Sequence, residues 1–208
     1  MTTTVTVVDY GVGNMNSVIN ALGHLGATVT VSDQPEVIAS AERLVLPGVG
    51  AFPDGMRLLR ERGLDEALHM AVGQGRPLLG ICLGMQLLFD GSDEFGDHPG
   101  LGLVPGRVIR LAPAAGFKVP QIGWNRLVPG DRSWAGTILA ATAPETMVYF
   151  VHSYAPDART AVGLLATCDY GGHPVTAVIQ HGPVSGCQFH PEKSGPAGLG
   201  ILSAFLQQ

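Results

Sequence analysis

The sequence predicts an α/β fold: an open, mostly parallel, twisted sheet flanked by helices, with an additional antiparallel β extension in the C-terminal half. Strand and helix patterns alternate through the first half, which is typical of a parallel sheet covered on both faces. The second half instead holds short β patterns separated by turns. No linker, repeat or low-complexity stretch divides the 208 residues, so we expect a single domain over residues 1–208.

The order of elements follows from apolar periodicity. In the first half, β-branched or apolar runs predict strands at 4–9, 28–31, 43–46 and 77–81. Helical spacing predicts helices at 16–25, 36–41, 54–73 and 83–89, the third of which Gly63 interrupts. In the second half, β patterns occupy 108–111, 119–127, 147–154, 161–170, 174–180 and 184–190. Gly171-Gly172 indicates a hairpin, and an amphipathic helix is expected at 196–206.

Composition argues against several functional classes. Only 14% of residues are charged, and the net charge of -5 comes without a basic cluster, which argues against nucleic-acid binding. The longest apolar run, 77–89, is too short to cross a bilayer, and the N-terminus lacks the basic residues of a signal peptide. Three cysteines without paired spacing, Cys82, Cys168 and Cys187, indicate free thiols in a reducing compartment. We expect a cytoplasmic protein that binds neither nucleic acid nor membranes.

Cys82 lies between Gly80 and Gly84, where a buried strand turns into a helical pattern. A side chain on such a sharp turn projects outward, while flanking glycines let the backbone bend and a substrate approach. The helix N-terminus favours negative charge, which assists loss of the thiol proton. The pattern therefore indicates a nucleophile. The alternative is a buried cysteine that packs as a small hydrophobic residue.

A cysteine nucleophile needs a base and a group that orients this base. Among seven histidines, His190 is the candidate because it ends a strand and precedes Pro191-Glu192. In extended chain, positions two apart point the same way, so Glu192 can lie beside the His190 ring and stabilise its imidazolium. The alternative is a proline turn with a solvated carboxylate. Alternation places Cys187 and His190 on opposite strand faces, so we expect no metal site.

Backbone amides are the candidates for oxyanion donors. Leu83 follows Cys82 at the helix start, and the loop Gly48-Val49-Gly50 ends another predicted strand. Glycines permit the dihedrals that turn an amide toward a ligand, although a tight β-to-α turn explains this loop equally well. The loop 10–14 also ends a strand, and ligand crevices of open α/β sheets lie outside such strand ends. The three loops together predict a site.

Taken together, the motifs resemble the class I glutamine amidotransferases and, within them, the glutaminase subunits of imidazole glycerol phosphate synthases. The elbow at Cys82 and the His-Pro-Glu at 190–192 are shared across the class. Narrower marks are Asp-Tyr-Gly-x-Gly-Asn at 9–14 and Gly-Trp-Asn at 123–125. Further matches lie at 47–50, 149–154 and 188–194, so the resemblance spans residues 9 to 194. It implies the flavodoxin-like form of the predicted fold.

By this resemblance, Cys82 attacks the side-chain amide of glutamine, His190 moves the protons, and Glu192 holds His190. A thioester forms, ammonia leaves, and water frees glutamate; no cofactor is expected. The loop 47–50 matches the oxyanion strand of the family. Positions that hold the glutamine head group are matched by Gln86, Glu94, Ser153 and Tyr154.

The resemblance also implies a partner. In the family, the glutaminase forms a heterodimer with a (βα)8-barrel cyclase, which uses the ammonia to make imidazole glycerol phosphate and aminoimidazole carboxamide ribotide in histidine biosynthesis. Positions near that docking face are matched by Asn14, Trp124, Tyr149 and Lys193. The alternatives are a glutaminase that serves a different ammonia-accepting synthase and a non-catalytic binding module on the same fold.

One position departs from the family pattern. Gln121 stands where the family often has histidine in Pro-His-x-Gly-Trp-Asn. Glutamine donates and accepts hydrogen bonds but does not titrate, so Gln121 cannot fill a role that needs a titrating imidazole at this position.

Overall fold

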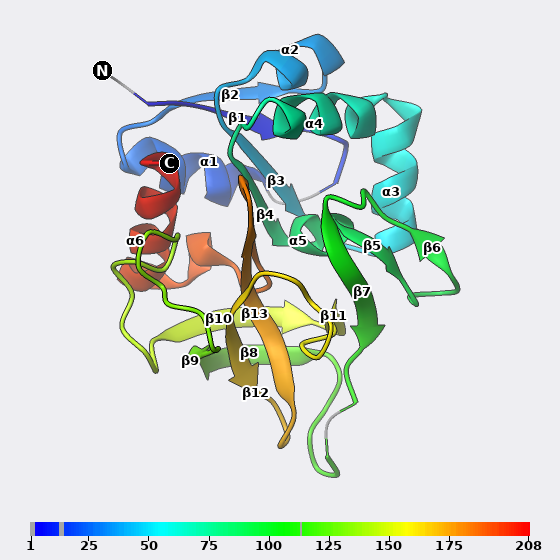
Figure 1. The fold of residues 1–208 in the computed structure, drawn as a ribbon, viewed down its shortest axis with the longest axis vertical. Coiled ribbons are helices and arrows are strands. Elements are labelled where there is room, and N and C mark those ends of the chain that lie inside the picture. Colours follow the sequence, from blue (N-terminus) through cyan, green and yellow to red (C-terminus); the bar gives the residue numbers. More distant parts are fainter. Residues whose placement is uncertain (1–2, 13–14, 113) are drawn as a thin grey trace.

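The main element of the computed structural model, which describes residues 3–12, 15–112 and 114–208, is an eight-stranded sheet of order β2-β1-β3-β4-β14-β13-β12-β9 (Figure 1). The first five strands in this order are parallel to one another. They are β2 (Thr28–Ser32), β1 (Thr4–Val8), β3 (Leu44–Gly48), β4 (Leu78–Cys82) and β14 (Val184–Cys187). The remaining three are antiparallel, namely β13 (Pro174–His181), β12 (Leu164–Asp169) and β9 (Val128–Pro129). The order 2-1-3-4 is that of a flavodoxin-like sheet, with its switch point between β1 and β3.

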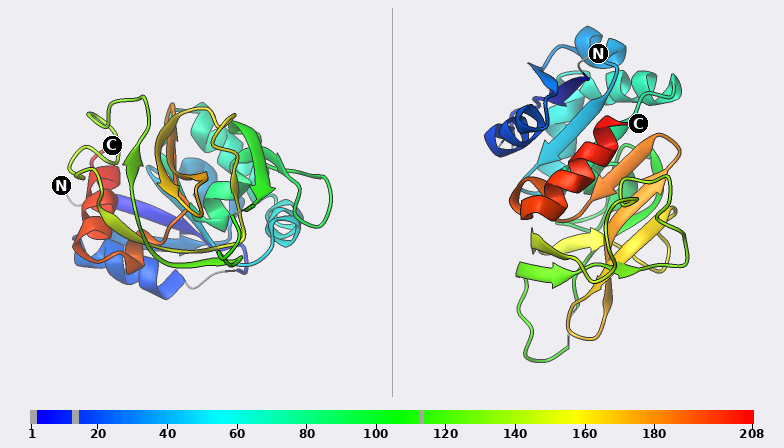
Figure 2. Two further views of the ribbon diagram at one scale, coloured as in Figure 1. Left: turned by 90° about the horizontal axis from the view of Figure 1, so that it is seen from below. Right: turned by 90° about the vertical axis from the view of Figure 1, so that its left-hand side faces the viewer.

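Helices cover both faces of the parallel part, because its side chains alternate between two apolar cores (Figure 2). Leu79 and Ile81 of β4 belong to the core beneath α1 (Met15–His24) and α6 (Gly195–Leu206). Leu78 belongs to the core on the other side. That side carries α2 (Pro35–Ser40), α3 (Phe52–Glu61), α4 (Leu64–Gly73) and α5 (Leu83–Leu87).

Two smaller sheets complete the fold. One is the antiparallel pair of β8 (Gln121–Arg126) and β10 (Met147–His152). The other has the order β11-β7-β5-β6 and consists of β11 (Tyr154–Pro156), β7 (Val104–Arg110), β5 (Phe89–Ser92) and β6 (His98–Pro99). A 3-10 turn, η1 (Pro191–Lys193), links β14 to α6. None of the helices in the described part of the chain has the length and apolar character needed to cross a lipid bilayer.

The fold class expected from the sequence is confirmed, and the differences concern single elements and their ends. The expected helix 54–73 is two helices, because Gly63 between them takes φ 66. The expected helix 83–89 ends at Leu87, and Phe89 begins the strand β5, which the sequence pattern missed. Residues 78–89 are all buried, and a run buried on every side has no period that separates helix from strand. The strand expected at 184–190 stops at Cys187.

The short helix α5 lies directly against β3, and Gly84 makes this close approach possible. A Cβ at Gly84 would lie 1.8 Å from the carbonyl oxygen of Leu46, a backbone atom that cannot move aside alone. By contrast, a Cβ at Gly73, the last residue of α4, would meet nothing within 4 Å.

We predict that Gly84→Ala lowers the free energy of unfolding by about 3 kcal/mol, because overpacking forces α5 away from β3. The matched control, Gly73→Ala, should leave stability unchanged or raise it by roughly 0.5 kcal/mol through helix propensity. Urea unfolding monitored by circular dichroism measures both. Equal stability of the two variants would contradict the close packing described here.

Candidate active site

The Cys82 backbone forms a strained turn between β4 and α5. Its φ of 55 and ψ of -112 lie in a region that residues with a side chain rarely adopt. Such conformations cost on the order of 1–3 kcal/mol and are found mostly at functional sites. Gly80, two residues earlier on β4, leaves space for the bend, since a Cβ there would lie 2.7 Å from the backbone nitrogen of Met85. The turn holds the Cys82 side chain at the carboxyl edge of the sheet.

His190 reaches the same edge because β14 lies beside β4, with Cys187 paired to Ile81. Its backbone N–H donates to the carbonyl oxygen of Tyr149 at 2.9 Å, and its own carbonyl accepts from the Ser194 hydroxyl at 2.7 Å. These two bonds fix the backbone of His190 between β10 and α6.

Glu192 lies beside His190, as the sequence analysis expected, but for a different reason. The Nδ1 atom of His190 and the Oε1 atom of Glu192 are 2.8 Å apart, and both side chains are buried. The expected extended chain is wrong at this point: Pro191 to Lys193 form the 3-10 turn η1, which folds the carboxylate back under the ring. The strand cannot continue here because proline lacks the N–H that a sheet requires.

The charge environment favours a protonated imidazole. Burial lowers the pKa of His190, but hydrogen bonding and charge from Cys82 and from Glu192 raise it more, to about 9. The second ring nitrogen, Nε2, is buried and has no hydrogen-bond partner among the described residues. This nitrogen is therefore available to exchange a proton with the sulfur of Cys82 and with a bound molecule.

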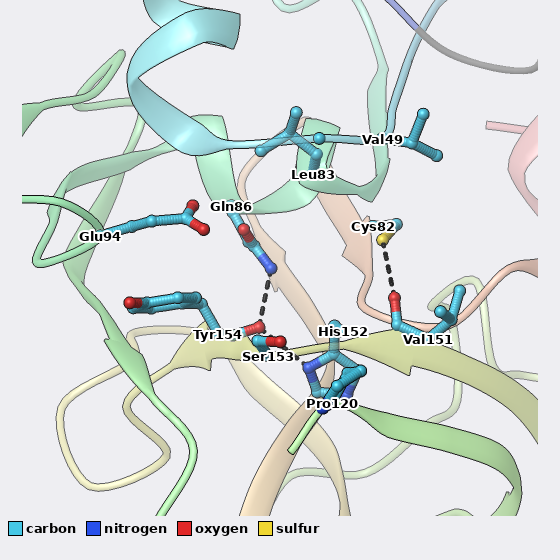
Figure 3. Close-up of a pocket in the computed structure, with 11 residues that line it drawn as sticks. Val49, Cys82, Leu83, Gln86, Glu94, Pro120, Val151, His152, Ser153 and Tyr154 are labelled. Atoms are coloured by element: carbon cyan, nitrogen blue, oxygen red, sulfur yellow. Dashed lines mark hydrogen bonds between the residues drawn. The ribbon is translucent and has the colours of Figure 1, made fainter.

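A pocket of about 280 Å³ opens beside Cys82 (Figure 3). All but one of the residues expected to bind substrate line it: Val49, Gly50, Leu83, Gln86, Glu94, Ser153 and Tyr154. Gly48 does not; it ends β3 as the paired neighbour of Cys82 and borders a smaller cavity of about 20 Å³. That cavity also touches His190, Glu192 and Lys193. The predicted residues from five distant segments thus meet around two adjoining spaces.

Two side chains of the pocket are held by hydrogen bonds. Glu94 accepts from the backbone N–H of Phe52 at 2.8 Å through Oε2, which places a carboxylate at the start of α3. Gln86 donates from Nε2 to the carbonyl oxygen of Tyr154 at 2.8 Å, a bond drawn in Figure 3. Glu94 and Gln86 thus present fixed polar groups to a ligand.

Gln188 is a site residue that the sequence analysis missed. Its side chain is fully buried, and its Nε2 lies 3.8 Å from the Cys82 sulfur. Its Oε1 accepts from Gln86 Nε2 at 3.1 Å. The available signal was its place in the quoted segment 188–194, two residues before His190.

The residues expected at a docking face lie outside the pocket. Trp124 and Tyr149 are cross-strand neighbours on β8 and β10, with ring centroids 6.0 Å apart in an edge-to-face arrangement. Lys193 belongs to η1 and lines the smaller cavity. The prediction for Asn14 lies outside the described residues.

His152 lines the pocket and was given no role by the sequence analysis. Burial, reinforced by the charge of His190, lowers its pKa to about 4, although a hydrogen bond to the Tyr154 carbonyl opposes the change. Because that carbonyl only accepts, Nδ1 carries the proton and donates at 2.9 Å. Gln121, the departure from the family pattern, pairs with His152 across β8 and β10, and its Nε2 lies 3.6 Å from the Cys168 sulfur.

We predict that His152 makes stability depend on pH between about 4 and 6.5. In this range His152 is protonated in the unfolded chain but neutral in the folded protein. The free energy of unfolding therefore decreases as the pH falls. The loss should reach roughly 3 kcal/mol near pH 4 and should be absent in His152→Gln. Urea unfolding of both proteins across this range measures the difference. Parallel stability curves for the two proteins would contradict a lowered pKa of His152 in the folded state.

Comparisons with known proteins agree with this geometry. The family model described as "Glutamine amidotransferase class-I" matches residues 6–208. The "Imidazole glycerol phosphate synthase subunit HisH 1" of Legionella pneumophila (strain Lens) is 46% identical over 210 residues, covering 98% of both chains. The HisH subunit of Bacillus velezensis is 47% identical over 97% of this chain and 94% of that protein. In fold, the structure of PurLQS from Thermotoga maritima is similar, with a TM-score of 0.75 at 20% identity, covering 100% of this chain and 99% of that chain. The chain therefore belongs to the class I glutamine amidotransferase family.

Proposed function

We propose that this protein is the glutaminase subunit of an imidazole glycerol phosphate synthase, acting in histidine biosynthesis. The observation that carries the proposal is the position of Cys82 on the wall of a pocket lined by fixed polar groups, with the hydrogen-bonded pair of His190 and Glu192 beside it at a smaller cavity. Identity of 46% and 47% to HisH subunits over nearly the whole chain supports the choice of this synthase over others. The match of residues 6–208 to one family model supports a single catalytic domain.

The chemistry follows from the three residues. The Cys82 sulfur attacks the side-chain carbonyl carbon of glutamine, and the tetrahedral intermediate collapses as the C–N bond breaks. His190 gives its Nε2 proton to the leaving nitrogen, so ammonia departs and a glutamyl thioester remains. His190 then takes a proton from water, which attacks the thioester and releases glutamate, so that the Cys82 thiolate and the His190 imidazolium are restored. Glu192 stabilises the imidazolium throughout.

Backbone amides are placed to stabilise the intermediate. Leu83 N–H stands at the first position of α5, directly after the sulfur-bearing residue. Val49 and Gly50 line the same pocket, where Figure 3 shows Val49 on the side of Leu83, and Gly50 takes φ 110. We assign these amides to the developing oxyanion, since donors fixed at that point stabilise charge without rearranging solvent.

The substrate's head group fits the far end of the pocket, where Figure 3 shows Glu94, Gln86 and Tyr154 on one side. The Glu94 carboxylate supplies the negative charge that the α-ammonium of glutamine requires. Gln86 and Ser153 supply neutral hydrogen-bonding groups. We propose that these residues hold glutamine with its side-chain amide toward Cys82.

The partner we propose is a (βα)8-barrel cyclase that forms a heterodimer with this chain in the cytoplasm. Ammonia is a nucleophile only while neutral, so direct transfer to the partner avoids its protonation in bulk water. We place the docking face on the outer side of β8 and β10, formed by Ile122, Trp124, Met147 and Tyr149. Ile122 is 63% exposed and Trp124 is 53% exposed, which is unusual for large apolar side chains on adjacent positions of one sheet face.

The docking face is connected to the chemistry. Strand β10 carries Tyr149 on the docking face and also places the Val151 carbonyl 3.8 Å from the Cys82 sulfur (Figure 3). Lys193, directly after Glu192, borders the smaller cavity beside His190. We propose that binding of the nucleotide-loaded cyclase at this face raises the rate of glutamine hydrolysis.

We predict that Cys82→Ala abolishes glutamine-dependent synthesis of imidazole glycerol phosphate by the complex, by a factor on the order of a thousand or more. Synthesis from ammonium salts should persist, because the cyclase accepts free ammonia. Cys168→Ala, which removes a buried thiol that does not line the pocket, is the matched control and should retain both activities.

Both activities are measured with the co-purified complex, and glutamate release is also followed for the isolated chain. Loss of ammonium-dependent synthesis in Cys82→Ala would contradict the division of labour between the subunits. A wild-type chain as active alone as with its loaded partner would contradict activation. Co-purification with another synthase would identify the alternative acceptor.

We predict that Trp124→Ala raises the Kd for the cyclase by about ten-fold or more, since buried aromatic anchors dominate interface energy. Met70→Ala is the matched control: Met70 is also 53% exposed but lies on α4, away from the docking face (Figure 1). Isothermal titration calorimetry measures both. Equal affinities for the two variants would place the docking face elsewhere.

A further inference from the structure

We infer that Gln188 is a further catalytic residue, whose side-chain amide donates a hydrogen bond to the Cys82 sulfur and stabilises its thiolate. This inference rests on the proposed role of Cys82 as nucleophile. Gln188 is a fully buried polar side chain whose amide nitrogen lies 3.8 Å from the sulfur.

The main chain fixes the position of Gln188. Its backbone N–H donates to the Ala177 carbonyl at 2.9 Å, which extends the pairing of β13 and β14 by one residue beyond Cys187. Its neighbours Cys187 and Phe189 lie in the apolar core beneath α6. Side chains alternate along the chain, so Gln188 points to the opposite side, toward Gln86 of α5, and its amide nitrogen lies near the Cys82 sulfur.

Hydrogen-bond logic fixes the orientation of the amide. The Tyr154 carbonyl only accepts, so the end of Gln86 that faces it must be the NH2 group. The same NH2 group donates to Gln188, whose facing atom must therefore be Oε1. The remaining end of Gln188, its NH2 group, then faces the sulfur at 3.8 Å. A chain of three groups thus aims a donor at the sulfur.

Burial strengthens the hydrogen bond from this donor to a charged sulfur. Gln188 is 0% exposed and Cys82 is 6% exposed, so water contributes little to the solvation of a thiolate here. Hydrogen bonds to a charged group are stronger than those to a neutral one, and more so where the dielectric is low. The contact therefore favours the thiolate over the thiol. Gln188 is not among the residues that line the pocket, so its amide does not occupy the space that substrate enters.

The test is the pH dependence of Cys82 alkylation by iodoacetamide, in the full chain alone and in its complex with the cyclase. Gln188→Met keeps the length of the side chain and removes the donor. We expect the pH midpoint of alkylation to rise by about one unit. In the complex, kcat for glutamine should fall about ten-fold at neutral pH, while KM stays within about two-fold. Synthesis from ammonium salts should not change.

Two further variants separate loss of the donor from a general effect of changing a buried polar side chain. Gln188→Glu has the same shape and replaces the donor with an acceptor, so its alkylation midpoint should rise at least as far as that of Gln188→Met. Ser185→Ala removes a buried polar group on the neighbouring strand β14, one with no partner among the described residues, and should leave the alkylation midpoint unchanged. An unchanged midpoint in both folded Gln188 variants would overturn the inference. A wild-type complex that does not hydrolyse glutamine would instead overturn the proposed function.

A measurement on the wild-type chain covers the case in which both variants fail to fold. The side-chain NH2 resonances of Gln188 should titrate with the alkylation midpoint, and this titration should disappear in Cys82→Ala. NH2 resonances that do not respond to pH over this range would also overturn the inference.

Discussion

The site depends on the parallel pairing of β4 with β14, from Leu78 opposite Val184 to Ile81 opposite Cys187. Parallel neighbours end at the same edge of a sheet, so the residues that follow them meet although they are far apart in the sequence. Cys82 ends one strand, and Gln188 and His190 follow the other. Register matters as much as adjacency, because a slip of one residue would turn Gln188 away from the sulfur.

Local surroundings distinguish the three buried cysteines. Burial raises the pKa of Cys168 to about 11, and burial together with the charge of Glu192 raises that of Cys187 as well, so both stay protonated at neutral pH. Cys82 is also buried, but an imidazole, an amide donor and a helix N-terminus surround its sulfur. A buried polar group without a hydrogen-bond partner would destabilise the fold, and here His190 is paired with Glu192 and Gln188 with Gln86. The positive φ of Cys82 also costs conformational free energy. The close packing of α5 on β3 holds the backbone in this conformation.

Much of the site could be predicted from local sequence, because the features that carry it are local. The glycines around Cys82 predict a turn, and Pro191 predicts that the strand ends at His190. The placement of Glu192 was predicted for the wrong reason, since extended alternation was assumed where a 3-10 turn forms. Strand β5 was missed because residues 78–89 are buried on every side and carry no period. Gln188 was missed because its partners, Gln86 and Cys82, are brought to it only by tertiary pairing.

The central claim is that this pairing activates one thiol among three for attack on a glutamine side chain. Intact mass and peptide mapping after treatment with a glutamine analogue that carries a chloroketone, with the cyclase present, test it most directly. The account predicts one adduct per chain, located on Cys82, formed much more slowly when His190 is replaced by alanine. Labelling of Cys168 or Cys187, or equal labelling of Cys82 with and without the imidazole, would contradict it.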